Sequence, residues 1–199
     1  MEAADVINLK ELEEARAGGL RPQLEACLIG LGESRLVVGG RRSAMRYAGE
    51  ALRMRVAPYP FRWQQRGRSR LLQARLELAG GNFARSLAEA RDLVAASTRS
   101  GDAVRVVAAR LLEAEALATS GAEIDTTGIG ELLKRAGDVL GAEAWRLTAR
   151  LARLTGNAGW EALAERQLEH VVQGSGSHGP ALRAFAEAQI GGSGPRSAA

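Results

Sequence analysis

The feature that most constrains the fold is a short motif that recurs along the chain. Residues 74–82 and 149–157 both begin with Ala-Arg-Leu and end with Gly-Asn. Residues 114–121 are a weaker third copy, and residues 36–40 resemble the end of a fourth. The glycines of successive copies lie about 35 to 41 residues apart, a period typical of helix–turn–helix repeats. The repeat predicts a stack of helical hairpins, an architecture that usually holds or senses a partner.

Composition agrees with a helical stack. A chain of 199 residues corresponds to one large domain or a short solenoid. Apolar residues make up 46% of the chain and aromatic residues only 4%, so Leu, Ala and Val must fill the core. Lys10 and Lys134 are the only lysines among many arginines, a bias typical of GC-rich bacterial genomes. Because the chain has one cysteine, an acidic start and no long apolar run, we expect a soluble cytoplasmic protein that does not bind membranes.

Apolar periodicity predicts an all-α protein in which no strand is expected. The predicted helices span about 4–17, 22–38, 41–56, 62–79, 83–98, 102–119, 129–140, 142–154, 158–172 and 180–190. The domain organisation follows as an acidic N-terminal helix (1–19), a repeat domain (20–173), a Gly/Ser linker (174–179), a short C-terminal helix (180–190) and a disordered tail (191–199).

Turn residues mark the ends of these helices. Pro58 and Pro60 predict a loop over 57–61, because proline lacks the amide proton that a helix needs. Asn82 and Asn157 follow glycine turns and are expected to cap the next helices through their side-chain oxygens. Thr127 is expected to cap a helix after a polar turn from 120 to 130.

Paired helices of small residues and Leu, joined by Gly-Asn or Gly-Gly turns such as Gly81-Asn82-Phe83, resemble the tetratricopeptide (TPR)-like superfamily. The period of about 40 residues is similar to the C-terminal helical arrays of bacterial MalT-like and AfsR-like signal-transduction ATPases and transcriptional regulators. The resemblance covers about residues 20–173 and implies a right-handed α-α superhelix of about four hairpins. The tryptophan and terminal proline of the strict repeat are missing, and no phosphate-binding loop with its lysine is present. The resemblance therefore implies a stand-alone array or the C-terminal part of a larger regulator.

Charge is distributed very unevenly. Residues 41–76 contain ten arginines and one acid, Glu50, so this segment carries a net charge of +9 although the whole chain carries +4. The candidate binding residues lie at the start of the fourth helix and are Arg62, Trp63, Arg66, Arg68, Arg70 and Arg75. Arg62, Arg66 and Arg70 share one helix face by their spacing of four residues. Guanidinium groups beside an aromatic ring are typical of sites for acidic peptides or nucleic acid.

Three interpretations of the arginines remain open. They could pair with the acidic first helix or with acids of neighbouring repeats, bind an acidic protein or peptide, or bind nucleic acid through the segment 41–75. The resemblance favours a non-catalytic protein- or peptide-binding scaffold in bacterial signalling or transcription control. A further alternative is a degenerate regulator fragment that self-associates as a homodimer through an open end of the stack.

The remaining reactive side chains predict no catalytic site, metal site or cofactor. Trp145, Trp160 and Cys27 are expected in the core, since each lies at a helical apolar position. His170 and His178 are eight residues apart and lack the spacing of metal ligands. Two glutamates, Glu113 and Glu115, are expected to be solvated.

Overall fold

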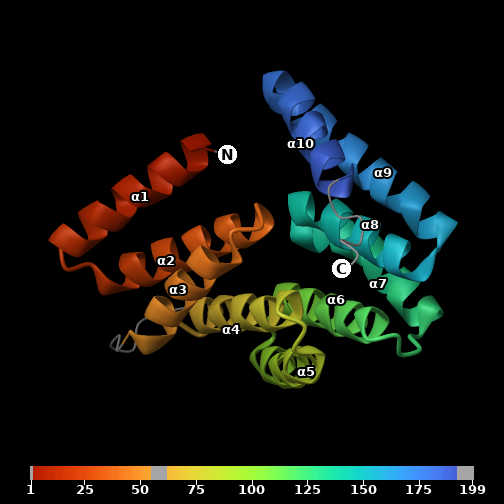
Figure 1. The fold of residues 1–199 in the computed structure, drawn as a ribbon, viewed down its shortest axis with the longest axis horizontal. Helices are drawn as coiled ribbons and strands as arrows, with labels where there is room; N and C mark the ends of the chain where they lie inside the picture. Colours follow the sequence, from red (N-terminus) through yellow and green to blue (C-terminus); the bar gives the residue numbers. More distant parts are fainter. Residues whose placement is uncertain (1, 55–61, 192–199) are drawn as a thin grey trace, which may run out of the picture. The chain divides into compact units, whose positions relative to one another are not determined.

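The computed structural model describes residues 2–54 and 62–191, and these residues form ten α-helices, two short 3-10 helices and no strand (Figure 1). The all-α prediction is therefore confirmed. The first five helices are α1 (Glu2–Ala17), α2 (Arg21–Val37), α3 (Arg41–Arg53), α4 (Arg62–Ala79) and α5 (Phe83–Ser100). The others are α6 (Ala103–Thr119), α7 (Thr126–Leu140), α8 (Ala144–Thr155), α9 (Ala158–Gly174) and α10 (Gly179–Gly191), with 3-10 turns η1 (Gly141–Glu143) and η2 (Gly176–His178).

The chain divides within α6 into two compact units, Met1–Glu113 and Ala114–Ala199. In the first unit each of the helices α1 to α4 packs against the next one along the chain, and α2 also contacts α4. Leu28, Ile29 and Leu31 of α2 are fully buried between them. Gly32 lets α2 approach α4 closely, because a Cβ atom at this position would lie 2.6 Å from the Cδ2 atom of Leu72.

The second unit packs α7, α8, α9 and α10 in the same sequential manner. Trp145 of α8 and Leu168 of α9 form its core with Ala186 of α10. A partly buried polar chain links three helices: the Thr148 hydroxyl lies 2.7 Å from the Gln167 Oε1 atom, and the Gln167 amide donates to the carbonyl of Leu133 at 3.0 Å. Because these groups satisfy one another, they fix the register of α7, α8 and α9 without a large desolvation cost.

Glycines with positive φ angles mark most turns between helices. They lie at residues 19 and 39, then 81, 101, 121 and 141, and then 156 and 176, so steps of 20 residues recur within each group. One pair of backbone hydrogen bonds closes the turns after α1, α2, α4, α5 and α6. After α4, for example, the Gly81 amide donates to the carbonyl of Leu78 and the Asn82 amide donates to that of Glu77. This Schellman pattern satisfies carbonyls at the helix end and reverses the chain, which makes the helical hairpin.

Helix capping follows the sequence prediction at one asparagine and not at the other. Asn157 accepts the Trp160 amide at 3.1 Å, as predicted. Asn82 was predicted to cap α5, but it makes no cap hydrogen bond and donates its side-chain amide to the Glu77 carboxylate at 2.7 Å. The predicted cap Thr127 is also wrong: Asp125 caps α7, accepting the amides of Thr127 and Gly128. At Asn82, the nearby Glu77 carboxylate accepts the side-chain amide. At the start of α7, Asp125 occupies the N-cap position, whereas Thr127 already lies within the helix.

The predicted element boundaries hold within a few residues except at two places. The turn predicted to reach residue 130 ends earlier, because α7 begins at Thr126. The segment 174–179, predicted as a flexible linker, is helical: α9 continues to Gly174, η2 follows, and α10 starts at Gly179. The predicted loop 57–61 and the predicted tail beyond residue 191 lie outside the described residues. Among the described residues, no helix is both long and apolar enough to cross a membrane.

Gly81 provides a direct test of the turn geometry. Its φ angle is 79°, and an added Cβ atom would meet nothing within 4 Å, so Gly81→Ala introduces backbone strain alone. We expect a loss of about 1–2 kcal/mol in the free energy of unfolding. As a matched control, Gly49→Ala lies in helix α3, where the new methyl would meet only the end of the Arg53 side chain. The free energy of unfolding of this control variant should increase by roughly 0.5–1 kcal/mol. Chemical denaturation measures the free energy of unfolding of both variants. If the two values change in the same direction, the left-handed conformation assigned to Gly81 is contradicted.

Glu77 ties the end of α4 to the start of α5. Its carboxylate accepts hydrogen bonds from Asn82 at 2.7 Å and from Gln73 at 2.9 Å, and Arg85 lies 3.4 Å away. These contacts lower the pKa of Glu77, with the Asn82 hydrogen bond as the main cause and burial opposing it. A carboxyl with a lowered folded pKa stabilises the fold above its unfolded pKa, and this contribution is lost as the pH falls through the folded value.

The replacement Glu77→Gln should therefore destabilise the protein more at pH 6 than at pH 3. The measurement is the free energy of unfolding of both proteins at the two pH values. In an Asn82→Ala background the pH dependence of the difference should shrink, because the largest cause of the pKa shift is gone. An unchanged pH dependence in that background would show that Asn82 does not hold the carboxylate.

Candidate partner-binding surface

The arginines of α4 are in part already paired inside the first unit. The Arg68 guanidinium lies 2.6 Å from the Glu33 carboxylate of α2. Arg70 lies 3.1 Å from Glu89 and 3.6 Å from Asp92, both on α5. The interpretation that arginines pair with acids of neighbouring helices is therefore confirmed at these two positions. Such pairs, held between packed helices, are screened less by salt than exposed ones and leave less charge for a partner.

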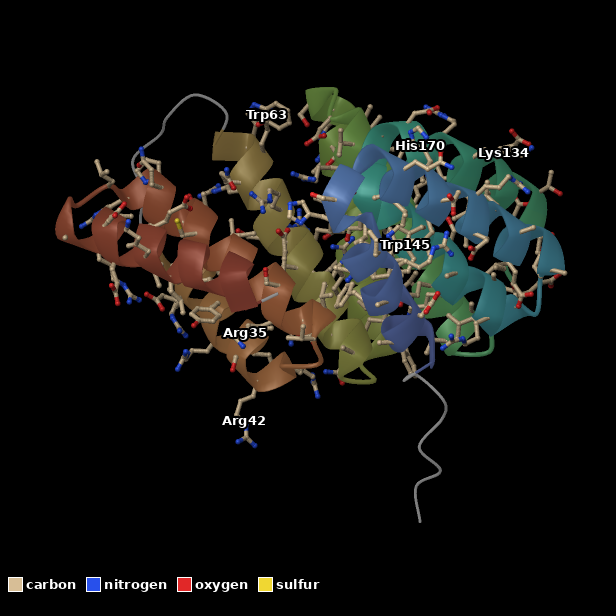
Figure 2. The ribbon with its side chains drawn as sticks, turned by 90° about the horizontal axis from the view of Figure 1, so that it is seen from above. Arg35, Arg42, Trp63, Lys134, Trp145 and His170 are labelled. Carbon is tan, nitrogen blue, oxygen red and sulfur yellow. The ribbon has the colours of Figure 1, made fainter. Side chains whose placement is uncertain are left out.

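The other candidates on α4 divide into exposed and half-buried side chains. Trp63 is 44% exposed, Arg66 is exposed, and Arg75 is half-buried. Figure 2 shows Trp63 at the outer edge of the first turn of α4. Arg62 begins the helix, but its side chain lies outside the described residues. The six predicted residues therefore do not form one continuous charged surface.

Helix α3 has a basic and apolar outer face that the sequence analysis did not single out. We define the α3 face by five of the six exposed side chains of the helix, which are Arg42, Met45, Arg46, Leu52 and Arg53; the sixth, Arg41, lies against the end of α4 at Gly80. Met45 and Leu52 are about half exposed, at 51% and 48%. Figure 2 shows Arg42 pointing away from the ribbon.

Within the described part of the chain, none of the three arginines on the α3 face forms an ion pair. Arg46 lies over the ring of its neighbour Tyr47, 4.9 Å from the centroid. The single acid of the helix, Glu50, is bound to Arg16 of α1 at 2.8 Å and so does not neutralise the face. Three cations next to two exposed apolar side chains can attract an acidic segment and bury its apolar residues at the same time.

The sequence contained a signal for this face. Ala44, Tyr47, Ala48 and Ala51 follow helical spacing and are buried, which places their stripe toward the core. Met45 and Leu52 are seven residues apart and lie beside that stripe, next to the arginines. If every apolar residue of the helix is placed in one stripe, the difference between the buried and the exposed set is lost.

The other candidate side chains occupy structural positions. Trp145 and Trp160 are buried, as predicted for core residues, and His170 is exposed on α9 (Figure 2). The prediction that Glu113 and Glu115 are solvated is wrong. Glu115 is only 5% exposed and forms an ion pair with Arg150, and Glu113 accepts from Arg91 at 2.8 Å. No group of three or more potential metal ligands occurs within residues 2–54 and 62–191.

Comparison with known proteins adds no relative: no family model matches the chain, and no curated protein or solved structure matches it significantly.

Cys27 is a half-buried thiol beside the first unit's core. Its Sγ atom lies 4.0 Å from the Glu11 carboxylate of α1. Burial and the negative charge of Glu11 raise the pKa of the thiol. Because the thiolate is the reactive form, we expect Cys27 to react with a disulfide reagent at pH 8 more slowly than free cysteine.

The variant Glu11→Gln should accelerate that reaction, since it removes one cause of the raised pKa. Glu13→Gln is the matched control, because Glu13 is also on α1 and is exposed. The rate is followed by the absorbance of the released thiolate. Equal acceleration by both variants, or by neither, would contradict the assigned role of Glu11.

Proposed function

We propose that this chain is a non-catalytic, TPR-like helical-repeat protein that binds an acidic protein segment through the α3 face. The similarity of the chain to regulator arrays, as argued from its repeat, supports a role in bacterial signalling or transcription control. The proposal requires no cofactor and no metal ion.

The repeat part of the proposal rests on the glycine turns. The turns after α1, α2, α4, α5 and α6 are closed by the same pair of backbone hydrogen bonds, and the left-handed glycines recur in steps of 20 residues within each of three groups, or 40 residues for a helical hairpin. Sequential packing, with additional contacts from α2 to α4 and from α7 to α9, is what stacked hairpins require. A right-handed superhelix of such hairpins would present successive helices along a surface, with room for an extended partner.

The binding part of the proposal rests on one observation: the α3 face keeps three arginines without a carboxylate among the described residues, beside two exposed apolar side chains. A peptide whose Asp or Glu residues alternate with large apolar residues satisfies both features. Nucleic acid would use the cations but would leave Met45 and Leu52 without a matching group. The internal ion pairs of Arg68 and Arg70 also reduce the positive charge available to phosphates.

A synthetic peptide of alternating Glu and Leu residues is a suitable probe, with polyglutamate and a single-stranded oligonucleotide of similar charge as comparisons. We expect the Glu/Leu peptide to bind at least about tenfold more tightly than polyglutamate, because it also buries apolar surface. The double variant Arg42→Glu/Arg46→Glu should weaken peptide binding by about tenfold, since two like-charge contacts replace two attractive ones. Fluorescence anisotropy measures all three affinities.

The control variant Arg110→Glu/Arg166→Glu changes the net charge equally at exposed positions on α6 and α9. Its affinity for the peptide should be within about threefold of that of the native protein. Thermal melts followed by circular dichroism test whether both double variants are folded. Equal loss in the two variants would reduce the proposal to non-specific charge attraction. Tighter binding of the oligonucleotide, with a steep decrease in added salt, would replace it with nucleic-acid binding.

A further inference from the structure

Arg105 lies in a half-buried position in the first unit, where its side chain packs against Gly67 of α4. It is the third residue of α6. Its side chain lies against the backbone of α4 at Gly67: a Cβ atom at this glycine would be 3.5 Å from the Cγ, Cδ and Nε atoms of Arg105. The stem of the arginine is thus packed on α4, which fixes the location of its guanidinium.

Three features of this location disfavour a positive charge. Burial is the largest of them and lowers the pKa of Arg105. Arg68 and Arg75 lie close enough to lower it further. The third is the helix dipole, whose positive end is at the first turn of α6. A folded protein rarely places an arginine where burial, like charges and the dipole all oppose it unless something else stabilises the charge.

The nearby acids offset these costs only in part. Asp102 and Glu33 favour the charged form of Arg105. However, an Asp102 carboxylate oxygen accepts the backbone amide of Arg105 at 3.1 Å, and Glu33 is hydrogen-bonded to Arg68 at 2.6 Å. The Arg105 Nε atom is buried and has no acceptor among the described residues. A buried donor without an acceptor destabilises the protein by roughly 1–3 kcal/mol, so an acceptor that binds to it would recover this free energy.

We propose that the cluster of Arg68, Arg75 and Arg105 is a binding site for an oxyanion, a phosphate or carboxylate group of a ligand. The Nε–H of Arg105 donates to one oxygen of the anion, and the negative charge of the anion offsets the repulsion of Arg105 by Arg68 and Arg75. The guanidinium fork matches the geometry of both groups, whereas a small halide ion offers no pair of acceptors. The site lies on α4 and α6, separate from the α3 face, and does not depend on the proposed function.

The test titrates inorganic phosphate and, separately, acetate into the full chain, with ionic strength held constant by sodium chloride. Isothermal titration calorimetry gives the affinities, and the ¹⁵Nε–¹Hε signal of Arg105, assigned in the native protein through bonds from its own backbone amide, reports the contact itself. We expect saturable binding with a shift of that signal. Arg105→Gln should bind at least about tenfold more weakly, because a hydrogen bond to a charged group is lost. Arg110→Gln, an exposed arginine of the same helix, should bind like the native protein.

Each result decides the proposal. Tighter binding of phosphate identifies a phosphorylated ligand, and comparable binding of acetate identifies an acidic side chain; both support the site. An Arg105 signal that does not move at saturating phosphate and acetate overturns the proposal, even if Arg105→Gln fails to fold. Equal weakening by Arg105→Gln and Arg110→Gln would also overturn it, because general charge attraction would then explain the binding.

Discussion

The left-handed glycine after most of the helices is the constraint on which the rest of the structure depends. A residue with a side chain would strain a turn whose φ angle is near 70°, whereas glycine accepts it and lets two backbone amides satisfy the end of the helix. Because the turns are then only two or three residues long at most junctions, consecutive helices must run back along one another. The positions of the arginines relative to their acids, and of the α3 face relative to the core, follow from that reversal.

The packing of the hairpins determines which charged side chains are paired within the fold and which remain available to a partner. On α4 the reversal brings Glu33 from α2 and Glu89 from α5 beside Arg68 and Arg70, so the most basic helix in the sequence is partly neutralised by its neighbours. On α3 the core takes the alanine stripe, and the one acid is turned toward α1, where Arg16 binds it. The same run of arginines therefore serves two purposes: on α4 it helps to hold helices together, and on α3 it leaves a charged surface.

Sequence periodicity predicted the helices and most of their ends, because glycine and asparagine act locally on the chain. It failed where the deciding partner is distant or competes with the local one. Asn82 turns from its expected cap toward Glu77, and Glu115, at an apparently solvated position, is buried against Arg150 of α8, 35 residues away. The candidate site shows the same limit: the basic segment was evident, but Glu33 and Glu89 lie 35 and 19 residues from the arginines that they bind, and no local pattern reveals such pairs.

Exposed and half-buried arginines also differ in what can stabilise them. On the α3 face, water solvates each guanidinium, so a partner gains little from charge alone and must add apolar contact to bind well. At Arg105 the solvation is already reduced and the Nε atom has no acceptor among the described residues, so an anion that reaches it gains a stronger and less screened interaction. A chain with both kinds of arginine can hold a broad acidic surface at one place and a single small anion at another, and the two affinities would respond differently to salt.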